Sequence, residues 1–112
     1  MLKTKDQGGI LEIQPEDLKE NLKGLRLIDV RRPDEYTGDL GHIKGTQLVT
    51  LGPDLLSFLE KAEKNSEIVF VCRSGGRSGQ ATMVAKSMGF EKAINMTGGM
   101  LRWNELKFPT EK

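Results

Sequence analysis

The chain has 112 residues, 37% hydrophobic and 29% charged, and this length and composition fit one folded domain with a single core. Its 17 Lys and Arg residues offset 16 acidic residues, giving a net charge of +1, so no overall field favours nucleic acid or an anionic membrane surface. We therefore expect one domain over residues 1–112 whose preference for anions is local.

Cysteine usage restricts the compartment and the cofactor chemistry. A single Cys cannot form an internal disulfide, and the first residues lead into no apolar signal segment, so we expect a reducing, cytoplasmic setting. No apolar stretch has the length of a transmembrane helix. One His and one Cys leave no zinc-ligand spacing. The sequence thus predicts neither a membrane span nor a metal site.

Short apolar segments punctuated by Pro and Gly divide the first part of the chain. Residues 10–13 alternate as a strand, and residues 15–22 open with Pro and early acidic residues, which indicates a helix. Residues 25–30 are predicted as a second strand. The polar segment 31–45 is predicted as a loop with one helical turn over residues 33–36.

The second part continues the alternation. Residues 46–51 are predicted as a strand, and residues 53–64 carry leucines on one helical face opposite charged residues. The apolar run 67–71 indicates a buried strand. A further amphipathic helix over residues 81–88 and a short strand over residues 93–96 follow.

Two glycines, Gly98 and Gly99, precede a last predicted helix containing Leu101, Trp103 and Leu106. Strands therefore alternate with helices along the whole chain. This alternation is typical of an open parallel sheet with helices on both faces, so the sequence predicts an α/β fold.

The only cysteine, Cys72, follows the predicted strand 67–71 and opens a loop rich in Gly and Arg, residues 72–78, which we call the Cys72 loop. In open parallel sheets, ligands bind beyond the carboxyl ends of the strands. A loop whose amides turn inward before a helix forms an anion-binding nest, and the helix dipole adds about half a positive charge. Cys72 is therefore predicted to be a nucleophilic thiolate. The alternative is a buried Cys that acts only as a small hydrophobic residue.

The composition of the loop agrees with this prediction. Gly75 and Gly76 permit the backbone angles that inward amides need, and Arg73 and Arg77 add positive charge. Lowering a thiol pKa from about 8.5 to about 6.5 corresponds to about 2.7 kcal/mol, which two or three charge-assisted N–H contacts supply.

Spacing argues against other chemistries that use such loops. Cysteine-dependent phosphatases place five residues between Cys and Arg, whereas Arg77 comes one residue earlier and Ser78 stands at that position. The shorter ring fits a persulfide sulfur and crowds a phosphoryl group. A nucleotide P-loop would need Gly-Lys-Ser or Gly-Lys-Thr, and thioredoxin-type chemistry would need a second Cys.

The Cys72 loop resembles the six-residue active-site loop of the rhodanese (sulfurtransferase) family, in particular of its small single-domain members. Three other segments resemble that family's motifs in the same order, so the motif-bearing part covers about residues 25–106. These segments are Ile28-Asp29-Val30-Arg31 with Glu35-Tyr36, Gly41-His42-Ile43-Lys44-Gly45-Thr46, and Gly98-Gly99-Met100-Leu101-Arg102-Trp103.

The resemblance implies a sheet of about five parallel strands flanked by helices, and a sulfur transfer without any cofactor beyond a transient cysteine persulfide. Cys72 is expected to take sulfur from a small anion such as thiosulfate or polysulfide and to pass it to cyanide or a thiol, including that of a thioredoxin-like protein. We expect a monomer without a nucleic-acid or membrane partner. The residues expected to bind the substrate are Arg73, Ser74, Gly75, Gly76, Arg77 and Ser78.

Four residues are expected to have a structural role, either as the main assignment or as an alternative. For Arg77, a structural ion pair is the alternative to substrate contact. Asp29 and Arg31 are expected to form a local ion pair that braces the rim of the site. His42 is expected to stabilise a loop, because sulfur transfer from a preformed thiolate needs no general base.

Two departures from the family pattern affect the expected substrate. Residues 37–40 add about two residues to the loop that borders the site, and Ser74 stands where larger thiosulfate enzymes carry Lys. Donor choice is therefore expected to differ. A persulfide carrier that delivers sulfur to a partner enzyme is the main alternative function, and a noncatalytic interaction module is a third.

Overall fold

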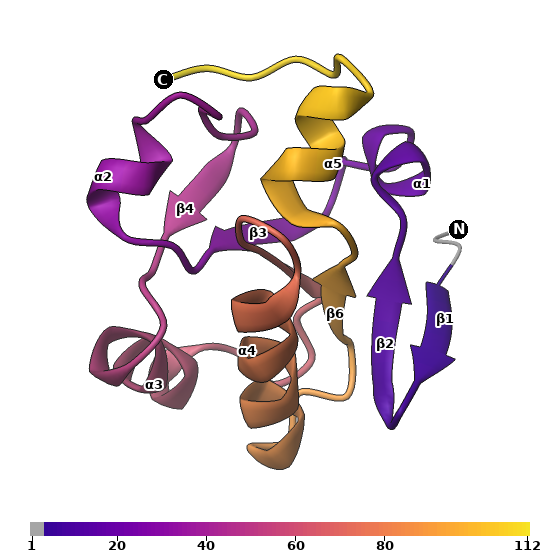
Figure 1. Ribbon diagram of the computed structural model, residues 1–112. Coiled ribbons are helices and arrows are strands. Elements are labelled where there is room, and N and C mark those ends of the chain that lie inside the picture. Colours follow the sequence, from indigo (N-terminus) through magenta and orange to yellow (C-terminus); the bar gives the residue numbers. More distant parts are fainter. Residues whose placement is uncertain (1–3) are drawn as a thin grey trace.

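The computed structural model describes residues 4–112, which form a three-layer α/β fold (Figure 1). The elements in chain order are β1 (Thr4–Gln7), β2 (Ile10–Ile13), α1 (Pro15–Lys19), β3 (Arg26–Asp29), α2 (Pro33–Tyr36), β4 (Thr46–Leu48), α3 (Pro53–Lys61), β5 (Ile68–Val71), α4 (Gly76–Ser87), β6 (Ala93–Met96) and α5 (Gly99–Glu105).

The strands form one sheet in the order β1-β2-β6-β5-β3-β4. Five of these strands, β2, β6, β5, β3 and β4, form a parallel sheet, as predicted. A sixth strand, β1, pairs antiparallel with β2 at the edge and was not predicted. The two join through Gly8 and Gly9, whose φ angles of 60° and 90° suit a tight hairpin turn.

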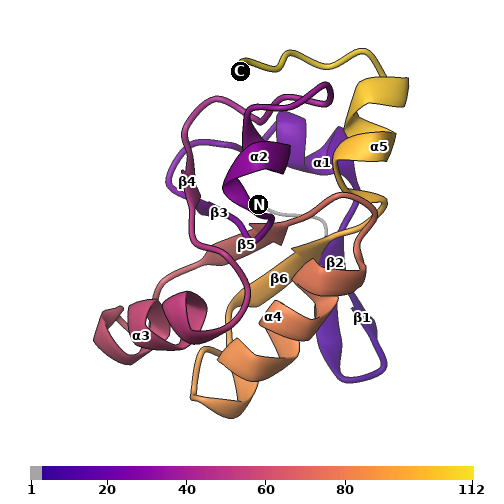
Figure 2. The same ribbon diagram turned by 60° about the vertical axis from the view of Figure 1, so that its left-hand side comes forward.

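The sheet separates two hydrophobic clusters because successive residues of a strand face opposite sides. Ile28 and Phe70 face the layer of α3 and α4, whereas Leu27 and Val69 face the layer of α1 and α5. Figure 2 shows these helix pairs on opposite sides of β5 and β6. All four residues of β5 are buried, as expected for a central parallel strand.

Several boundaries differ from those predicted. Helix α1 stops at Lys19, strand β4 stops at Leu48, and α3 stops at Lys61. Helix α4 begins at Gly76, five residues before the predicted start at residue 81. Apolar periodicity marks only the part of α4 that packs on the sheet, so it misses the first turn, which includes the end of the Cys72 loop.

The strand order places three functional segments together. Strands β6, β5 and β3 are neighbours, and their carboxyl ends lead to Gly98, Cys72 and Arg31 respectively. This is the edge at which open parallel sheets bind ligands. Within residues 4–112, no helix combines the length and apolar character that crossing a membrane requires.

Candidate active site

Cys72 follows β5 directly and lies almost fully buried, with 1% of its surface exposed. The Gly75 amide donates a hydrogen bond to Cys72 Sγ at 3.0 Å. Ser78 Oγ lies 3.2 Å from the same sulfur. The loop therefore curls around the thiol, and its sulfur faces hydrogen-bond donors from the start of α4.

Gly75 makes this curl possible, because its φ of 108° is rarely adopted by residues with a side chain. It precedes α4, and its carbonyl accepts a hydrogen bond from Gly79 N at 3.0 Å. Gly76 has no positive φ, and a Cβ there would meet no atom within 4 Å. The expectation that both glycines supply special backbone angles is thus wrong for Gly76, which is an ordinary first helical residue.

The start of α5 holds the other side of the loop. Met100 N donates to Cys72 O at 2.8 Å, and Leu101 N donates to Arg73 O at 3.0 Å. Gly99 lies so close that a Cβ on it would stand 2.4 Å from Arg73 C and O, and its φ is 57°. The Gly-Gly pair before the last helix therefore serves a close approach of two backbones.

The Cys72 thiol has a pKa below its ordinary value. Burial alone raises the pKa, because it disfavours the charged thiolate. The hydroxyl and amide of Ser78 and the amides of Gly75 and Ser74 lower the pKa by more than burial raises it. The geometry thus stabilises a thiolate inside a protein interior.

Behind the loop lies a polar contact that the sequence analysis did not identify. Ser78 Oγ donates to Asn95 Oδ1 at 2.5 Å, and Asn95 Nδ2 donates to Glu12 Oε2 at 3.1 Å. Asn95 lies on β6 and Glu12 on β2, two neighbouring strands. No local pattern marks these residues, because the contacts of Asn95 with Ser78 and with Glu12 arise only when the sheet forms.

Arg77 forms an ion pair with Glu35 of α2, at distances of 2.6 and 2.8 Å. The two hydrogen bonds from Arg77 lower the pKa of Glu35 to about 2, and Glu35 in turn raises the pKa of Arg77. The structure therefore shows the structural alternative for Arg77. Its contact with a substrate stays a prediction.

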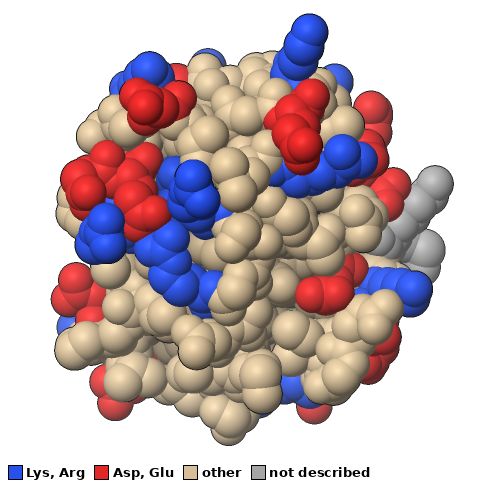
Figure 3. All heavy atoms as spheres, viewed as in Figure 1, with Lys and Arg blue, Asp and Glu red and all other residues tan. Residues whose placement is uncertain are grey.

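Arg73, the other arginine of the loop, is exposed. It borders a cleft of about 380 Å³ whose other walls come from α2 and from residues that follow it. The cleft is lined by Arg31, Asp34, Glu35, Gly38, Asp39, Leu40 and Arg73. The inserted segment 37–40 thus forms one wall, and Figure 3 shows basic and acidic side chains lying next to each other over α2.

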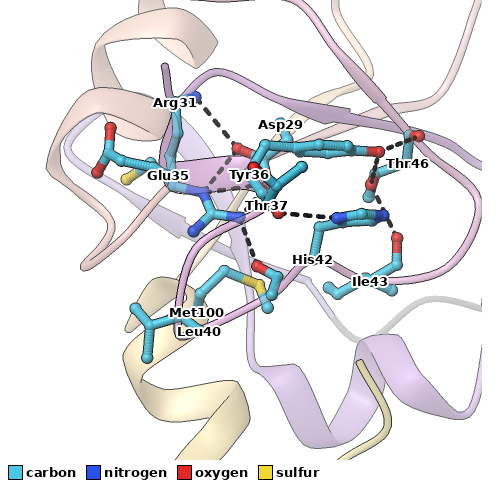
Figure 4. A network of polar contacts seen from close by, with 12 residues as sticks. Asp29, Arg31, Glu35, Tyr36, Thr37, Leu40, His42, Ile43, Thr46 and Met100 are labelled. Atoms are coloured by element: carbon cyan, nitrogen blue, oxygen red, sulfur yellow. Dashed lines mark hydrogen bonds and ion pairs between the residues drawn. The ribbon is translucent and has the colours of Figure 1, made fainter. Parts of the chain in front are cut away.

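Asp29 and Arg31 form a buried ion pair at the end of β3 (Figure 4). Arg31 Nη2 lies 2.8 Å from Asp29 Oδ2 and also donates to Gly41 O at 2.7 Å. The guanidinium is 1% exposed and the carboxylate 0%. The pair ties the end of the strand to the segment that borders the cleft, as a bracing role requires.

His42 lies in that same segment and has no contact with Cys72. Its ring stacks on Tyr36 with a centroid distance of 3.7 Å, and Nδ1 donates to Tyr36 O at 2.8 Å (Figure 4). Its backbone exchanges two hydrogen bonds with Glu111, at 2.8 and 2.9 Å. Trp103 Nε1 donates to Pro109 O nearby at 2.9 Å. His42 thus joins α2, the cleft wall and the last residues of the chain.

Over residues 4–112, no three His, Cys, Asp or Glu side chains come together as a metal-binding group. The loop residues Ser74 and Gly76 are exposed, whereas Ser78 is fully buried. The Ser78 side chain and the Gly75 amide therefore lie at the sulfur. The side chains of Arg73 and Ser74 are left at the surface.

Two curated relatives of this chain have names that refer to sulfur transfer or sulfur carriage. YtwF of Bacillus subtilis, which bears the name "Putative sulfurtransferase", is 37% identical over 97 residues, covering 84% of this chain and 90% of its own. The "Putative sulfur carrier protein YrkF" of the same species is 33% identical over 103 residues. That match covers 89% of this chain but 54% of YrkF, so the chain spans about half of that relative's length.

Solved structures and a family model agree with these relatives. The human single-domain sulfurtransferase TSTD1 superposes with a TM-score of 0.76 at 29% identity, covering 84% of this chain and 95% of the human protein. The model of the rhodanese-like domain matches residues 14–106, which include the Cys72 loop, the Gly98-Gly99 pair at the start of α5 and the buried Asp29–Arg31 pair. The chain therefore belongs to the family of rhodanese-like domains.

Proposed function

We propose that this protein is a sulfurtransferase that moves a sulfane sulfur from a donor, through a persulfide on Cys72, to a thiol or to cyanide. The observation that carries the proposal is the set of groups able to donate to one buried sulfur: the Gly75 amide, which donates at 3.0 Å, and the Ser78 hydroxyl, which lies 3.2 Å away. Such donors stabilise a negative sulfur in the resting thiolate and in the terminal sulfur of a persulfide.

The first half-reaction forms the persulfide. The Cys72 thiolate attacks the outer sulfur of the donor, a new S–S bond forms, and the old bond breaks with its electron pair on the leaving group. With thiosulfate, the leaving group is sulfite. With a polysulfide, it is the shortened polysulfide.

The second half-reaction discharges the persulfide. A thiolate or cyanide attacks the outer sulfur, the bond to Cys72 breaks, and the thiolate is regenerated. No proton has to be removed from Cys72 during either step, so the reaction uses no general base and the proposal includes no cofactor. Splitting one displacement into two in this way is the usual benefit of covalent catalysis.

The charged residues of the cleft favour one class of sulfur donor. Arg73 is the loop cation that lines it, and the acidic residues Asp34 and Asp39 line the same cleft. Arg77 is already paired with Glu35. Among the described residues that line the cleft, Arg73 is the one guanidinium outside an ion pair. One such cation beside carboxylates favours donors of low charge, such as the persulfides of small thiols, over the dianion thiosulfate. The proposed acceptor is a thiol, including that of a thioredoxin-like protein.

A sulfur carrier is the second candidate function. YrkF, a relative at 33% identity, is named as a sulfur carrier, and Cys72 is only 1% exposed, which would protect a stored persulfide from small thiols. A carrier would load sulfur once and release it to a partner protein. It would share the loop with an enzyme and differ from it in turnover.

Intact-mass measurement and a turnover assay separate these functions. Wild type and Cys72→Ser are incubated with polysulfide or thiosulfate and weighed, and thiocyanate is then followed after cyanide is added. A gain of one sulfur with many turnovers supports the transferase, and a gain with a single discharge supports the carrier. A wild type that gains no sulfur from any donor refutes both functions and leaves a noncatalytic module. The matched control is Ser74→Ala, which changes an exposed loop side chain and is expected to keep the persulfide.

A further inference from the structure

A line of hydrogen bonds runs from the sulfur across two neighbouring strands, β6 and β2. Cys72 Sγ lies 3.2 Å from Ser78 Oγ, which lies 2.5 Å from Asn95 Oδ1. Asn95 Nδ2 donates to Glu12 Oε2 at 3.1 Å and to Gly75 O at 3.4 Å. Ser78 is 0% exposed and Asn95 is 4% exposed, so water does not replace these partners.

The orientation of the Asn95 amide follows from its neighbours. The Glu12 carboxylate and the Gly75 carbonyl can only accept hydrogen bonds, so the NH₂ group must face them. The Oδ1 atom then faces Ser78 and can only accept. Ser78 must therefore donate its hydroxyl proton to Asn95.

This arrangement sets two acceptors against each other for one proton. A serine hydroxyl has a single proton, and the Cys72 thiolate on its other side also needs a donor. When the proton turns toward the sulfur, Asn95 Oδ1 becomes a buried acceptor without a partner. In the structure, no buried side-chain nitrogen or oxygen of residues 4–112 lacks a partner, so ionisation of Cys72 would create such a group.

We infer that Asn95 is a positioning residue that competes with the Cys72 thiolate for the Ser78 proton, and that Glu12 enforces this competition by fixing the Asn95 amide. Glu12 comes from β2, 83 residues before Asn95 in sequence. The pair thereby limits the fraction of Cys72 that is ionised before a sulfur donor binds. If the Asn95 amide could turn over, its NH₂ would donate to Ser78, and Ser78 would donate fully to the sulfur.

This inference rests on the proposed function for its biological use, since only a reactive thiol needs its ionisation set. Its physical content is independent of sulfur transfer, because it concerns the ionisation of Cys72 alone. The two can therefore fail separately.

Glu12→Gln tests the competition. Gln carries both a donor and an acceptor, so in this variant only the longer contact with Gly75 O, at 3.4 Å, still favours the orientation that turns the NH₂ of Asn95 away from Ser78. The rate at which iodoacetamide alkylates Cys72 is measured as a function of pH. The ultraviolet absorbance of the thiolate gives a second readout. We expect the rate at a pH below the thiol pKa to rise about tenfold, which corresponds to about one pKa unit.

The charge of Glu12 alone would also disfavour a thiolate, and a second background separates the two effects. If the competition operates, Glu12→Gln changes the rate far less in Ser78→Ala, because the shared proton is gone. If Glu12 acts only through its charge, the change is the same in both backgrounds, and the inference is overturned.

Asn95→Ala provides an independent variant. It removes the competing acceptor, so we expect faster alkylation at low pH than in wild type, and adding Glu12→Gln to it should give little further change. Circular dichroism checks that each variant is folded. A folded Asn95→Ala protein with the wild-type alkylation profile overturns the inference. Wild type that forms no persulfide, together with a Glu12→Gln effect that depends on Ser78, would refute the proposed function and leave this inference standing.

Discussion

Arg77 meets both carboxylate oxygens of Glu35, and this contact joins the first turn of α4 to α2 across 42 residues of sequence. The Arg77 side chain is 34% exposed and that of Glu35 is 17% exposed. The pair thus holds the outer side of the Cys72 loop against the helix that lines the cleft. Its strength can be measured through pH and mutation.

Glu35→Gln should lower the free energy of unfolding at pH 7 by about 1–2 kcal/mol, after allowance for screening at the partly exposed Arg77. The pKa of Glu35 is lowered from 4.5 to about 2 in the folded protein, so the stabilisation is complete above pH 4.5 and is lost as pH falls toward 2. Urea unfolding at several pH values checks this. Wild type and variant should converge in acid. Glu16→Gln, in the more exposed pair with Arg102, is the control and should cost less than about 0.5 kcal/mol.

Gly75→Ala and Gly76→Ala should behave in opposite ways although they are adjacent. Ala at residue 75 has to adopt a φ of 108°, so we expect a loss of about 1–3 kcal/mol and slower alkylation of Cys72, because the donating amide shifts. Ala at residue 76 begins a helix without contacts within 4 Å and should be neutral or slightly stabilising. Thermal unfolding and the alkylation profile give both readouts. Equal effects of the two substitutions would contradict the backbone account of the loop.

Gly99→Ala should damage the site through a clash of backbones. Its Cβ would stand 2.4 Å from the Arg73 carbonyl group, which α5 holds by a hydrogen bond from Leu101. We expect the hydrogen bonds at the start of α5 to break, at a cost of more than about 2 kcal/mol.

Gly45→Ala is the matched control for that clash. Gly45 also has a positive φ, of 91°, but a Cβ there would meet nothing within 4 Å. The difference in unfolding free energy between the two variants isolates the steric part. A difference near zero would show that the two backbones need not approach so closely.

Arg31→Met should be the most destabilising of these substitutions, because it leaves the Asp29 carboxylate buried without its cation. Removing one partner of a buried pair commonly costs about 3–5 kcal/mol. Arg32→Met, whose ion pair with Asp34 is exposed, is the control and should leave the unfolding midpoint unchanged. Chemical denaturation compares the two. A mild effect of Arg31→Met would argue that the pair does not brace the end of β3.

The parallel core could be predicted from the sequence because its strands are apolar and separated by amphipathic helices. Strand β1 was missed for the opposite reason, since its residues are polar and exposed and show no alternation. The Gly8-Gly9 pair was the one available signal for its hairpin. An edge strand without a buried face takes its stability from its neighbour and leaves little trace in hydrophobicity.

The nucleophile and its loop could also be predicted, because Cys72 and its glycines are adjacent in sequence. The residues that contact the loop from other parts of the chain could not be predicted from the sequence. Glu35 and Asn95 reach it from other strands and helices, and their contacts depend on the folded sheet. Asn95 lies between two apolar strand residues and resembles any half-exposed polar position of a strand until the structure shows Ser78 beside it.

The backbone exchange between His42 and Glu111 makes the tail of the chain a support for the segment that follows the cleft wall. A protease that cut just before Pro109 would remove this support while removing none of the groups that touch the sulfur. Such clipped protein would keep its thiol and lose control over what reaches it. For the same reason, an affinity tag attached directly after Lys112 would lie next to the contact between His42 and Glu111, and a long spacer is advisable in any kinetic work.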